Sequence, residues 1–322
     1  MSLAVHYSPD YVAAAHAFDT TRKAAWVADV VRDLDGVDIV PPAARWDDAA
    51  TETAIRRVHD GAYVDAVVTG EPRELAESQG FPWDPGLWTA VRASTAGVLS
   101  AVDAALGDPA DGRPRLTGSL SSGLHHAKHA TGDGYCTING LVVAAAHAVE
   151  QHGADVTVLD VDAHAGGGTD ELLRVHEDVL GPGRVRHLDL TTKPFDSYVH
   201  LSPRPGDVNV EDVALGGDDD AYLAAVDGLL AELPDPAADT GTDGGRARPH
   251  LVLHNAGMDP APEISFAALA ERERRIVAAI ATRGLAGVFV LAGGYTWHNS
   301  RDEVAAAHAT TVHAYAEFST GA

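Results

Sequence analysis

The sequence predicts an α/β protein in which a mainly parallel central sheet is covered by helices on both faces, as one three-layer domain over residues 1–322. Short apolar runs rich in β-branched residues alternate along the chain with longer stretches of helical periodicity. Two of the runs, 156–160 and 287–291, are mostly apolar and rich in β-branched residues, which is typical of buried central strands. No internal repeat or change in composition divides the chain, so one domain is expected.

The first half of the chain is expected to combine two short strands with several helices. Apolar residues at helical spacing predict a helix at 20–33, and two prolines bound a strand at 38–40, because proline cannot donate to a sheet ladder. The segments 80–86 and 118–134 are too rich in Gly with Pro or His to be regular, and they are expected to be loops. The other elements expected here are a strand at 3–7 and helices at 48–57, 60–68, 86–106 and 138–151.

The second half is expected to continue the alternation of strands and helices. The stretch 191–209 contains three prolines and is expected to be irregular. The polar tract 234–249 has no periodicity, so a mobile loop is expected there. The regular elements of this half are expected at 156–160, 169–178, 185–190, 219–232, 250–255, 265–283, 287–291 and 301–318.

The charge balance is strongly acidic, with 47 acidic and 23 basic side chains and a formal net charge of −24. Such a surface repels nucleic acid and anionic membranes, so neither is expected as a partner, and it favours a small substrate that is neutral or cationic. The same composition is also expected in a bacterial host that is salt-adapted or has a high-GC genome. The sequence leaves the oligomeric state open.

The cysteine content and the apolar runs indicate the compartment. A single cysteine, Cys136, excludes an internal disulfide and fits a reducing environment. No apolar run reaches the length of a membrane span, and residues 1–6 lack the basic and apolar segments of a signal peptide. A cytoplasmic protein is therefore expected.

Three ionisable side chains follow the run at 156–160 at intervals of two residues: Asp160, Asp162 and His164. If the extended backbone continues, side chains two residues apart point to the same face, so the three project together from the end of the strand. Burying two carboxylates and an imidazole is costly unless a cation compensates them. Mixed oxygen and nitrogen ligands suit zinc, or another divalent ion such as iron. The alternative is a solvated turn that binds no metal.

Parallel strands place their carboxyl ends at one edge of the sheet, where α/β proteins bind their ligands. The strand at 250–255 is followed closely by Asp259. Asp162, His164 and Asp259 are therefore expected to provide three metal ligands and to leave one position for water or substrate, as catalytic sites require.

Three further side chains are expected at the same edge. Tyr295 follows the last predicted strand after Gly293 and Gly294, which allow a close approach of the backbone, and its hydroxyl is placed to bond a developing oxyanion. His125 and His126 lie on a loop that enters this edge, and they are candidates for a general acid and a general base.

The chain contains five short motifs in a fixed order. They are Gly123-Leu124-His125-His126-Ala127, Gly134-Tyr135-Cys136, Asp160-Val161-Asp162-Ala163-His164, Asn255-Ala256-Gly257-Met258-Asp259 and Gly293-Gly294-Tyr295. In order and spacing, from about residue 3 to 318, they resemble the motifs of the histone deacetylase and acetylpolyamine amidohydrolase superfamily. They look closer to its class IV branch and bacterial relatives than to the classical branches. The resemblance implies an arginase/deacetylase-like fold and a metal-dependent amidohydrolase.

The resemblance also implies roles for residues around the metal. Asp162, His164 and Asp259 match the zinc ligands of the family. Tyr295 matches the tyrosine that polarises the scissile carbonyl, and it follows the matching glycines Gly293 and Gly294 at the substrate site.

Further roles are implied for the residues around the two histidines. Asp160 matches the carboxylate that hydrogen-bonds His125, and His126 matches the histidine nearest the metal-bound water. Gly134 and Tyr135 match the substrate tunnel, with Tyr135 as an aromatic wall. Asp160 also aligns, together with Asp189, with the family's structural monovalent cation site, which implies a bound potassium ion.

The implied activity is zinc-dependent hydrolysis of the amide of an acylated amine. The substrate is then acetyl-lysine in a peptide or protein, an acetylpolyamine or a small acylated metabolite. In the implied mechanism, zinc binds the acyl oxygen and a water and lowers the pKa of that water. His126 takes a proton from the water, zinc and Tyr295 stabilise the oxyanion, and a histidine returns the proton to the leaving amine.

One position departs from the family pattern. The family usually has Asp or Asn where this chain has Gly167, and that side chain would orient His126. The pKa and tautomer of His126 are therefore expected to be less constrained, and the pair of histidines to be weaker or specialised. The substitution Gly167→Asp is expected to change the pH–rate profile.

Two other functions stay open. One is a biosynthetic enzyme of secondary metabolism that uses the same metal site for other amide or imine chemistry, and the departure at Gly167 keeps this function open. The other is a catalytically silent homologue that binds acyl-lysine or metal. An arginase-type ureohydrolase is disfavoured, because the second Asp-rich motif of its two-metal site is not apparent.

Overall fold

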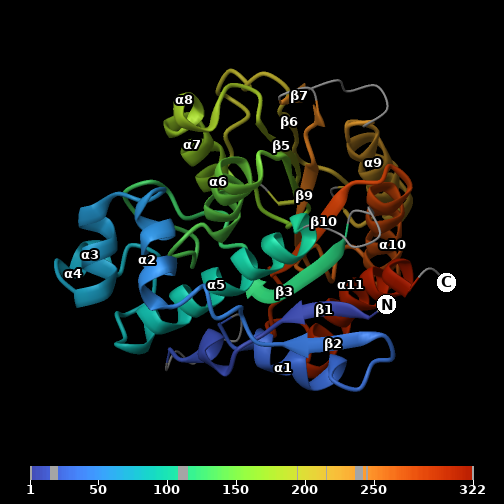
Figure 1. The fold of residues 1–322 in the computed structure, drawn as a ribbon. Coiled ribbons are helices and arrows are strands. Elements are labelled where there is room, and N and C mark those ends of the chain that lie inside the picture. Colours follow the sequence, from blue (N-terminus) through green and yellow to red (C-terminus); the bar gives the residue numbers. More distant parts are fainter. Residues whose placement is uncertain are drawn as a thin grey trace.

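The sheet predicted from the sequence is present in the computed structural model, which describes residues 2–14, 21–107, 115–193, 195–214, 216–235, 242–243 and 246–320. Its strands are β1 (Leu3–His6), β2 (Val37–Val40), β3 (Leu116–Ser122), β4 (Asp155–Asp160), β5 (Val185–Leu190), β6 (Val208–Val210), β9 (His250–Gly257) and β10 (Ala286–Ala292). They lie in the order β2-β1-β3-β10-β9-β4-β5-β6 (Figure 1). Every neighbouring pair is parallel, so all eight carboxyl ends lie at one edge.

Helices cover both faces of this sheet (Figure 1). One face carries α1 (Lys23–Val31), α9 (Asp219–Ala231), α10 (Phe266–Thr282) and α11 (Arg301–Thr320). The opposite face carries α2 (Asp48–Arg56), α3 (Gly61–Thr69), α5 (Gly86–Leu106), α6 (Gly140–His152) and α7 (Gly167–Val175). The short helices are η1 (Pro9–Val12), α4 (Arg73–Ala76) and α8 (Glu177–Leu180). The predicted three-layer α/β architecture is confirmed.

Strand β4 shows why the central strands carry apolar residues on both faces. Val156 and Val158 belong to the apolar core that the sheet shares with α5 and α6. Leu159 belongs to the core on the other face, with residues of α9 and α10. Because successive side chains of a strand point to opposite faces, a strand covered on both faces must be apolar at consecutive positions.

All six predicted strands are present, with ends that match or shift by at most two residues, but the eight-stranded sheet also contains β3 and β6. The prediction of a loop over 118–134 is wrong at its beginning, where the chain forms β3. This strand reads Leu-Thr-Gly-Ser-Leu-Ser-Ser and lacks the β-branched apolar residues of its neighbours. A Cβ atom at Gly118 would overlap the ring of Phe289 on β10, so the glycine makes room for the adjacent strand. Sheet pairing with β1 and β10 therefore determines this strand.

The predicted irregular stretch 191–209 is also wrong at its end. Residues 208–210 form the edge strand β6, which pairs with β5 through Leu188 and Val208. The predicted helix at 169–178 divides into α7 and α8 at His176. An edge strand of three residues carries too little sequence pattern to be recognised before its partner is known.

Parts of two predictions lie outside the described residues. The helix expected at 20–33 begins at Lys23, and residues 15–20 are not among those described. Most of the loop expected at 234–249 also lies outside them, although β7 (Thr242–Asp243) and β8 (Arg246–Ala247) within it form an antiparallel pair.

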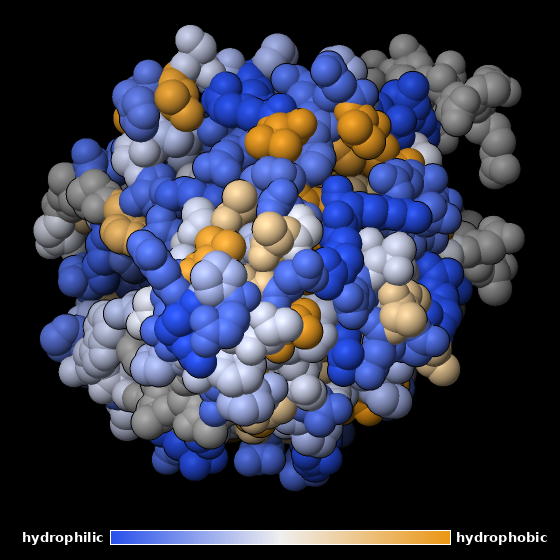
Figure 2. Space-filling model, turned by 90° about the vertical axis from the view of Figure 1, so that its left-hand side faces the viewer, coloured by the Kyte–Doolittle hydropathy of each residue, from blue (hydrophilic) through white to orange (hydrophobic). Residues whose placement is uncertain are grey.

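The surface shown in Figure 2 is mostly hydrophilic. Hydrophilic residues cover most of this face, and apolar residues appear on it in small scattered groups. Among the described helices, none combines the length and the apolar character that a bilayer span requires.

Candidate active site

Four adjacent strands bring the predicted site residues to one edge of the sheet. The loops that follow β3, β10, β9 and β4 carry His125, Tyr295, Asp259 and Asp162, respectively. These strands are neighbours in the sheet although their order in the chain is different. The parallel topology therefore gathers segments that are far apart in the sequence, as expected for a ligand site of an α/β protein.

The acidic turn after β4 is built by hydrogen bonds from the backbone to its own carboxylates. The N–H of Asp162 donates to Oδ1 of Asp160 at 3.1 Å, and the N–H of His164 donates to Oδ1 of Asp162 at 3.0 Å. The strand ends at Asp160, so the expected extension of its geometry to His164 is wrong. Side chain to backbone bonds two residues apart instead hold the turn and still bring the three groups together.

Asp162, His164 and Asp259 form a compact group of potential metal ligands. One donor atom from each residue lies within 4.8 Å of the others. Nδ1 of His164 lies 3.2 Å from Oδ1 of Asp162 and 3.0 Å from Oδ2 of Asp259. Oδ2 of Asp259 is buried and forms no hydrogen bond with the described residues. Two buried carboxylates, one with an unsatisfied oxygen, and one imidazole fit a divalent ion, because its charge and bonds supply what they lack.

The ionisation of this group reflects its buried carboxylates. Burial opposes a charge on His164, but Asp162 and Asp259 outweigh it and raise the pKa of His164 to about 10. Burial likewise opposes ionisation of Asp162, yet His125 and His164 bring its pKa below the usual range. Without a metal, a proton on His164 balances the carboxylates, and a divalent ion would have to replace that proton.

Two glycines bring the backbone before Tyr295 close to this group. Gly293 has a φ of +49°, and a Cβ atom there would overlap the carboxylate of Asp259. Gly294 has a φ of +80°, and a Cβ atom there would lie 2.8 Å from Nε2 of His308. Because L side chains rarely adopt these angles and would clash here, both positions require glycine.

Tyr295 lines the same cavity as the two loop histidines. The cavity opens to solvent and is also lined by Gly134, Tyr135 and Gly293. Burial, followed by the carboxylates of Asp259 and Asp162, raises the pKa of Tyr295, so its hydroxyl keeps its proton. Its ring stacks on Trp297, with centroids 4.6 Å apart.

His125 is held by Asp160. Its Nδ1–H donates to Oδ2 of Asp160 at 2.8 Å, and its Nε2 lies 3.5 Å from Oδ1 of Asp162. Burial opposes its charge, but the two carboxylates raise its pKa to about 10. The amide of Asn255 donates to the other oxygen of Asp160 at 2.8 Å, so this carboxylate is fixed at both ends.

His126 has a carboxylate partner that the sequence did not predict. Its Nδ1 lies 3.2 Å from Oδ2 of Asp196, a residue of the loop after β5. Burial, followed by the neighbouring charge of His125, lowers the pKa of His126. The expectation that Gly167 leaves this histidine less constrained is therefore wrong, because Asp196 supplies a carboxylate from another segment.

Asp189 lies beside Asp160 in the pairing of β4 with β5. Its Oδ2 accepts hydrogen bonds from the N–H of Gly166 at 2.8 Å and from the hydroxyl of Tyr198 at 2.9 Å. Its Oδ1 is buried and forms no hydrogen bond with the described residues. Burial and the charge of Asp160 raise the pKa of Asp189, so the pair would gain from a nearby cation.

Sequence reasoning also missed two buried cations near the site. The ammonium of Lys23, at the beginning of α1, donates to the carbonyl of Gly293 at 2.5 Å. The guanidinium of Arg272 on α10 donates to the carbonyls of Val161 at 3.1 Å and Gly257 at 2.7 Å. These two residues lie shortly before the candidate metal ligands Asp162 and Asp259. A lone Lys or Arg at a helix position carries no sequence signal for such a contact, since most are exposed.

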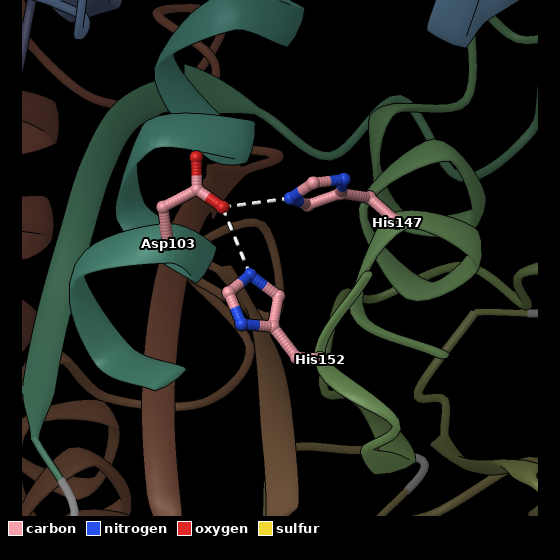
Figure 3. A group of neighbouring side chains, drawn as sticks. All are labelled: Asp103, His147 and His152. Atoms are coloured by element: carbon pink, nitrogen blue, oxygen red, sulfur yellow. Dashed lines mark hydrogen bonds and ion pairs between the residues drawn. The ribbon is translucent and has the colours of Figure 1, made fainter. Parts of the chain in front are cut away.

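A second group of similar composition lies away from this edge. Asp103 of α5 accepts hydrogen bonds from His147 at 2.7 Å and His152 at 2.9 Å, both of α6 (Figure 3). Its other oxygen accepts the indole N–H of Trp46 at 2.7 Å and forms an ion pair with Arg45 at 2.5 Å. Protein donors therefore satisfy both oxygens, and this group is explained as a polar junction between helices.

The parallel sheet, with a group of candidate metal ligands beyond the carboxyl ends of its strands, defines an α/β protein with a ligand site at the edge of the sheet. The histone deacetylase domain matches residues 16–312, and the chain belongs to the histone deacetylase family. It is 28% identical over 225 residues to a histone deacetylase-like amidohydrolase of Pseudomonas aeruginosa, covering 65% of this chain and 53% of that protein. It is 26% identical over 196 residues to an acetylpolyamine amidohydrolase of Mycoplana ramosa, covering 51% and 55%. The chain thus spans about half the length of these two relatives.

The fold is shared with a solved structure. The crystal structure of an acetylpolyamine aminohydrolase from Burkholderia pseudomallei superposes with a TM-score of 0.72, covering 98% of this chain and 99% of that one. The sequences are 19% identical, so the likeness confirms the arrangement of strands and helices alone.

Proposed function

We propose that this protein hydrolyses the amide bond of an acylated amine, with a divalent ion held by Asp162, His164 and Asp259. Zinc is the first candidate, and iron is the alternative. The observation that carries the proposal is the close group of Asp162, His164 and Asp259: the buried Oδ2 of Asp259 accepts no hydrogen bond within the described part of the chain and lies 3.0 Å from Nδ1 of His164. Two histidines and a tyrosine are gathered in the same site.

The two histidines have different ionisation states that suit different tasks. When bound, a divalent ion polarises the amide carbonyl and lowers the pKa of water. His126 has a lowered pKa and is neutral near pH 7, so it can accept the proton of the attacking water and pass it to the leaving amine. His125, held protonated by Asp160, offsets the negative charge that the reaction creates.

Tyr295 is suited to stabilise the reacting oxygen. Its raised pKa keeps the phenol protonated, so it can donate a hydrogen bond to the carbonyl oxygen as that atom becomes negative. Gly293 and Gly294 fix the backbone that presents it. Gly293 and Tyr295 line the cavity together with Gly134 and Tyr135, and these four would form its substrate-binding wall, with Gly294 as the link between Gly293 and Tyr295.

The substrate class follows from the cavity and the charge. Tyr135 stacks on Phe81 with ring centroids 5.0 Å apart, which gives the cavity an aromatic wall for an acyl chain. The net charge of −24 attracts an amine that is cationic away from the scissile amide. Acetyl-lysine peptides, acetylpolyamines and small acylated metabolites all meet this description, and neither nucleic acid nor a membrane is needed as partner.

The alternative of a different biosynthetic reaction loses its support. It depended on the missing carboxylate at Gly167, and Asp196 now stands beside His126. A silent homologue would have no need of two histidines and a tyrosine kept in the same cavity.

Asp160 and Asp189 would in addition hold a potassium ion, as two adjacent buried carboxylates with one oxygen unsatisfied. A thermal unfolding temperature that is unchanged when potassium replaces a large organic cation would speak against this part of the proposal.

Turnover tests the proposed function directly. The full chain is assayed with a fluorogenic acetyl-lysine peptide and with acetylated diamines, before and after treatment with a chelator. We expect turnover that the chelator abolishes and that added zinc or iron restores. Tyr295→Phe is expected to lower kcat by about 10²–10³ because one donor to the oxyanion is lost, while the bound metal stays at one ion per chain. Absence of turnover in the metal-loaded protein across these amides would reject the proposal.

A further inference from the structure

The carboxylate beside His126 belongs to a chain of charged groups. Oδ2 of Asp196 lies 3.2 Å from Nδ1 of His126, and Oδ1 lies 3.3 Å from the ammonium of Lys128. Lys128 also donates to Asp133 at 2.7 Å. The pKa of Asp196 is lowered because its bonds to His126 and Lys128 outweigh its burial. A carboxylate can only accept, so Nδ1 of His126 carries the proton of this bond.

Asp196 fills the space that a side chain at position 167 would need. A Cβ atom at Gly167 would overlap the carbonyl oxygen of Asp196, and it would lie 2.5 Å from Cγ and 2.6 Å from Oδ1 of the same residue. A side chain at 167 and Asp196 in this position therefore exclude each other. The glycine at the beginning of α7 is what allows the carboxylate to reach His126 from the other segment.

The segment around Asp196 is tied to the site on both sides. The N–H of Ala165, next to His164, donates to the carbonyl of Phe195 at 3.2 Å. The ring of Phe195 contacts His126 edge-on, with centroids 5.0 Å apart. On the other side, Tyr198 donates to Asp189 at 2.9 Å. The carboxylate is thus held by the fold, because the residues around it bond to the turn after β4 and to β5.

The backbone at Asp196 indicates that this position is specialised. Its φ of +55° lies in the left-handed region, which most side chains avoid and which Asp, Asn and Gly accept best. The side chain is mostly buried, with 11% of its surface exposed, so it does not belong to the solvated acidic surface.

We propose that Asp196 is the positioning residue of His126: it accepts the Nδ1–H bond, fixes the tautomer and leaves Nε2 unprotonated toward the cavity. In relatives, the Asp or Asn side chain at position 167 would orient this histidine, whereas here Asp196 orients it from the 195–198 segment. Gly167 and Asp196 therefore belong together, because the glycine leaves the space that the carboxylate of Asp196 fills. The role of His126 as a base rests on the proposed function, whereas the effect of Asp196 on the tautomer of His126 does not depend on it.

The test removes the carboxylate without straining the backbone. Asp196→Gly keeps the left-handed angle, because glycine adopts it freely, and Asp196→Asn keeps an oxygen that can accept the Nδ1–H bond. Asp212→Gly is the matched control, since Asp212 also has a left-handed φ, of +59°, and lies outside the site.

The first readout is independent of activity. In protein labelled with ¹⁵N-histidine, the two ring nitrogens of His126 report its tautomer, and His126→Gln assigns the signals. We expect a single Nδ1–H form in the wild type and in Asp212→Gly, and a mixture in Asp196→Gly. A tautomer that is unchanged in Asp196→Gly would overturn the proposal, whether or not any substrate is turned over.

The second readout is kinetic. In Asp196→Gly we expect kcat to fall by about 10- to 100-fold, as for other partners that orient a site histidine, with KM and metal content within twofold of the wild type. Asp196→Asn is expected to recover most of the loss. An unchanged kcat in Asp196→Gly, or an equal loss in Asp212→Gly, would contradict the positioning role.

Discussion

Two regions of the molecule gather carboxylates and imidazoles, and they differ in what satisfies them. At the edge of the sheet, Oδ2 of Asp259 is buried and accepts no hydrogen bond from the described residues. Between α5 and α6, both oxygens of Asp103 are occupied by imidazole, indole and guanidinium donors. Each group places its donor atoms within 4.8 Å of one another, so proximity alone does not distinguish them.

The difference shows that a metal site is better recognised by a carboxylate oxygen without a hydrogen bond than by the mere presence of Asp and His side chains. A divalent ion at the sheet edge would pair a carboxylate oxygen that accepts no hydrogen bond from any described residue and has the imidazole of His164 beside it, which relieves a desolvation cost. At the helix junction, an ion would have to break four existing contacts of Asp103. It would also meet the guanidinium of Arg45, which lies 3.2 Å from Nε2 of His147 and keeps its charge at any ordinary pH.

The largest expected effect is the loss of the bound metal when one of Asp162, His164 and Asp259 is changed. Asp259→Asn removes one charge and one ligand, so we expect the protein to bind no stoichiometric ion and turnover to fall by about 10³ or more. Asp103→Asn is the matched control and should keep one ion per chain and full turnover. Metal content by mass spectrometry, with turnover measured on the same samples, checks both. Two ions in the wild type and one in Asp103→Asn would contradict the distinction.

The pH dependence of metal binding sharpens the comparison. The pKa of His164 is raised to about 10 in the metal-free protein, so near pH 7 this imidazole carries a proton that a metal ion must displace. Below pH 10, the apparent affinity should therefore rise by about tenfold per pH unit, with about one proton released per ion bound. Calorimetric titration in buffers of different ionisation enthalpy measures the release. An affinity that is flat between pH 6 and 8 would show that His164 is not protonated in the metal-free state.

The fold was more predictable from the sequence than the details of the site. Strands such as β4 and β10 are buried on both faces and carry apolar residues toward both, so their pattern can be recognised locally. Strand β3 lacks this pattern and is a strand because its neighbours pair with it. The metal-type ligands were predicted because they directly follow such strands. Asp196 could not be predicted, because it lies 70 residues from His126 and their contact depends on the packing of two loops.

The smallest expected effect concerns the stability of the helix junction. Asp103 is a carboxylate whose pKa is lowered because its bonds to His147, His152 and Trp46 outweigh its burial. A lowered pKa in the folded state means that its contribution to stability is complete above the unfolded value of about 4 and is lost as the pH falls below it. At pH 7, Asp103→Asn should therefore lower the free energy of unfolding by about 2 kcal/mol, since charge-assisted hydrogen bonds are weakened.

Urea unfolding of the same variant checks this value against an exposed pair. Asp227 forms an ion pair with Arg275 at 2.8 Å, but its side chain is 56% exposed, so Asp227→Asn should cost about 0.5 kcal/mol or less. The decrease in the free energy of unfolding caused by Asp103→Asn should be smaller near pH 3, because the wild-type carboxylate is then partly protonated in the unfolded chain and folding must release that proton. If Asp103→Asn were as stable as the wild type at pH 7, the junction would not depend on its carboxylate.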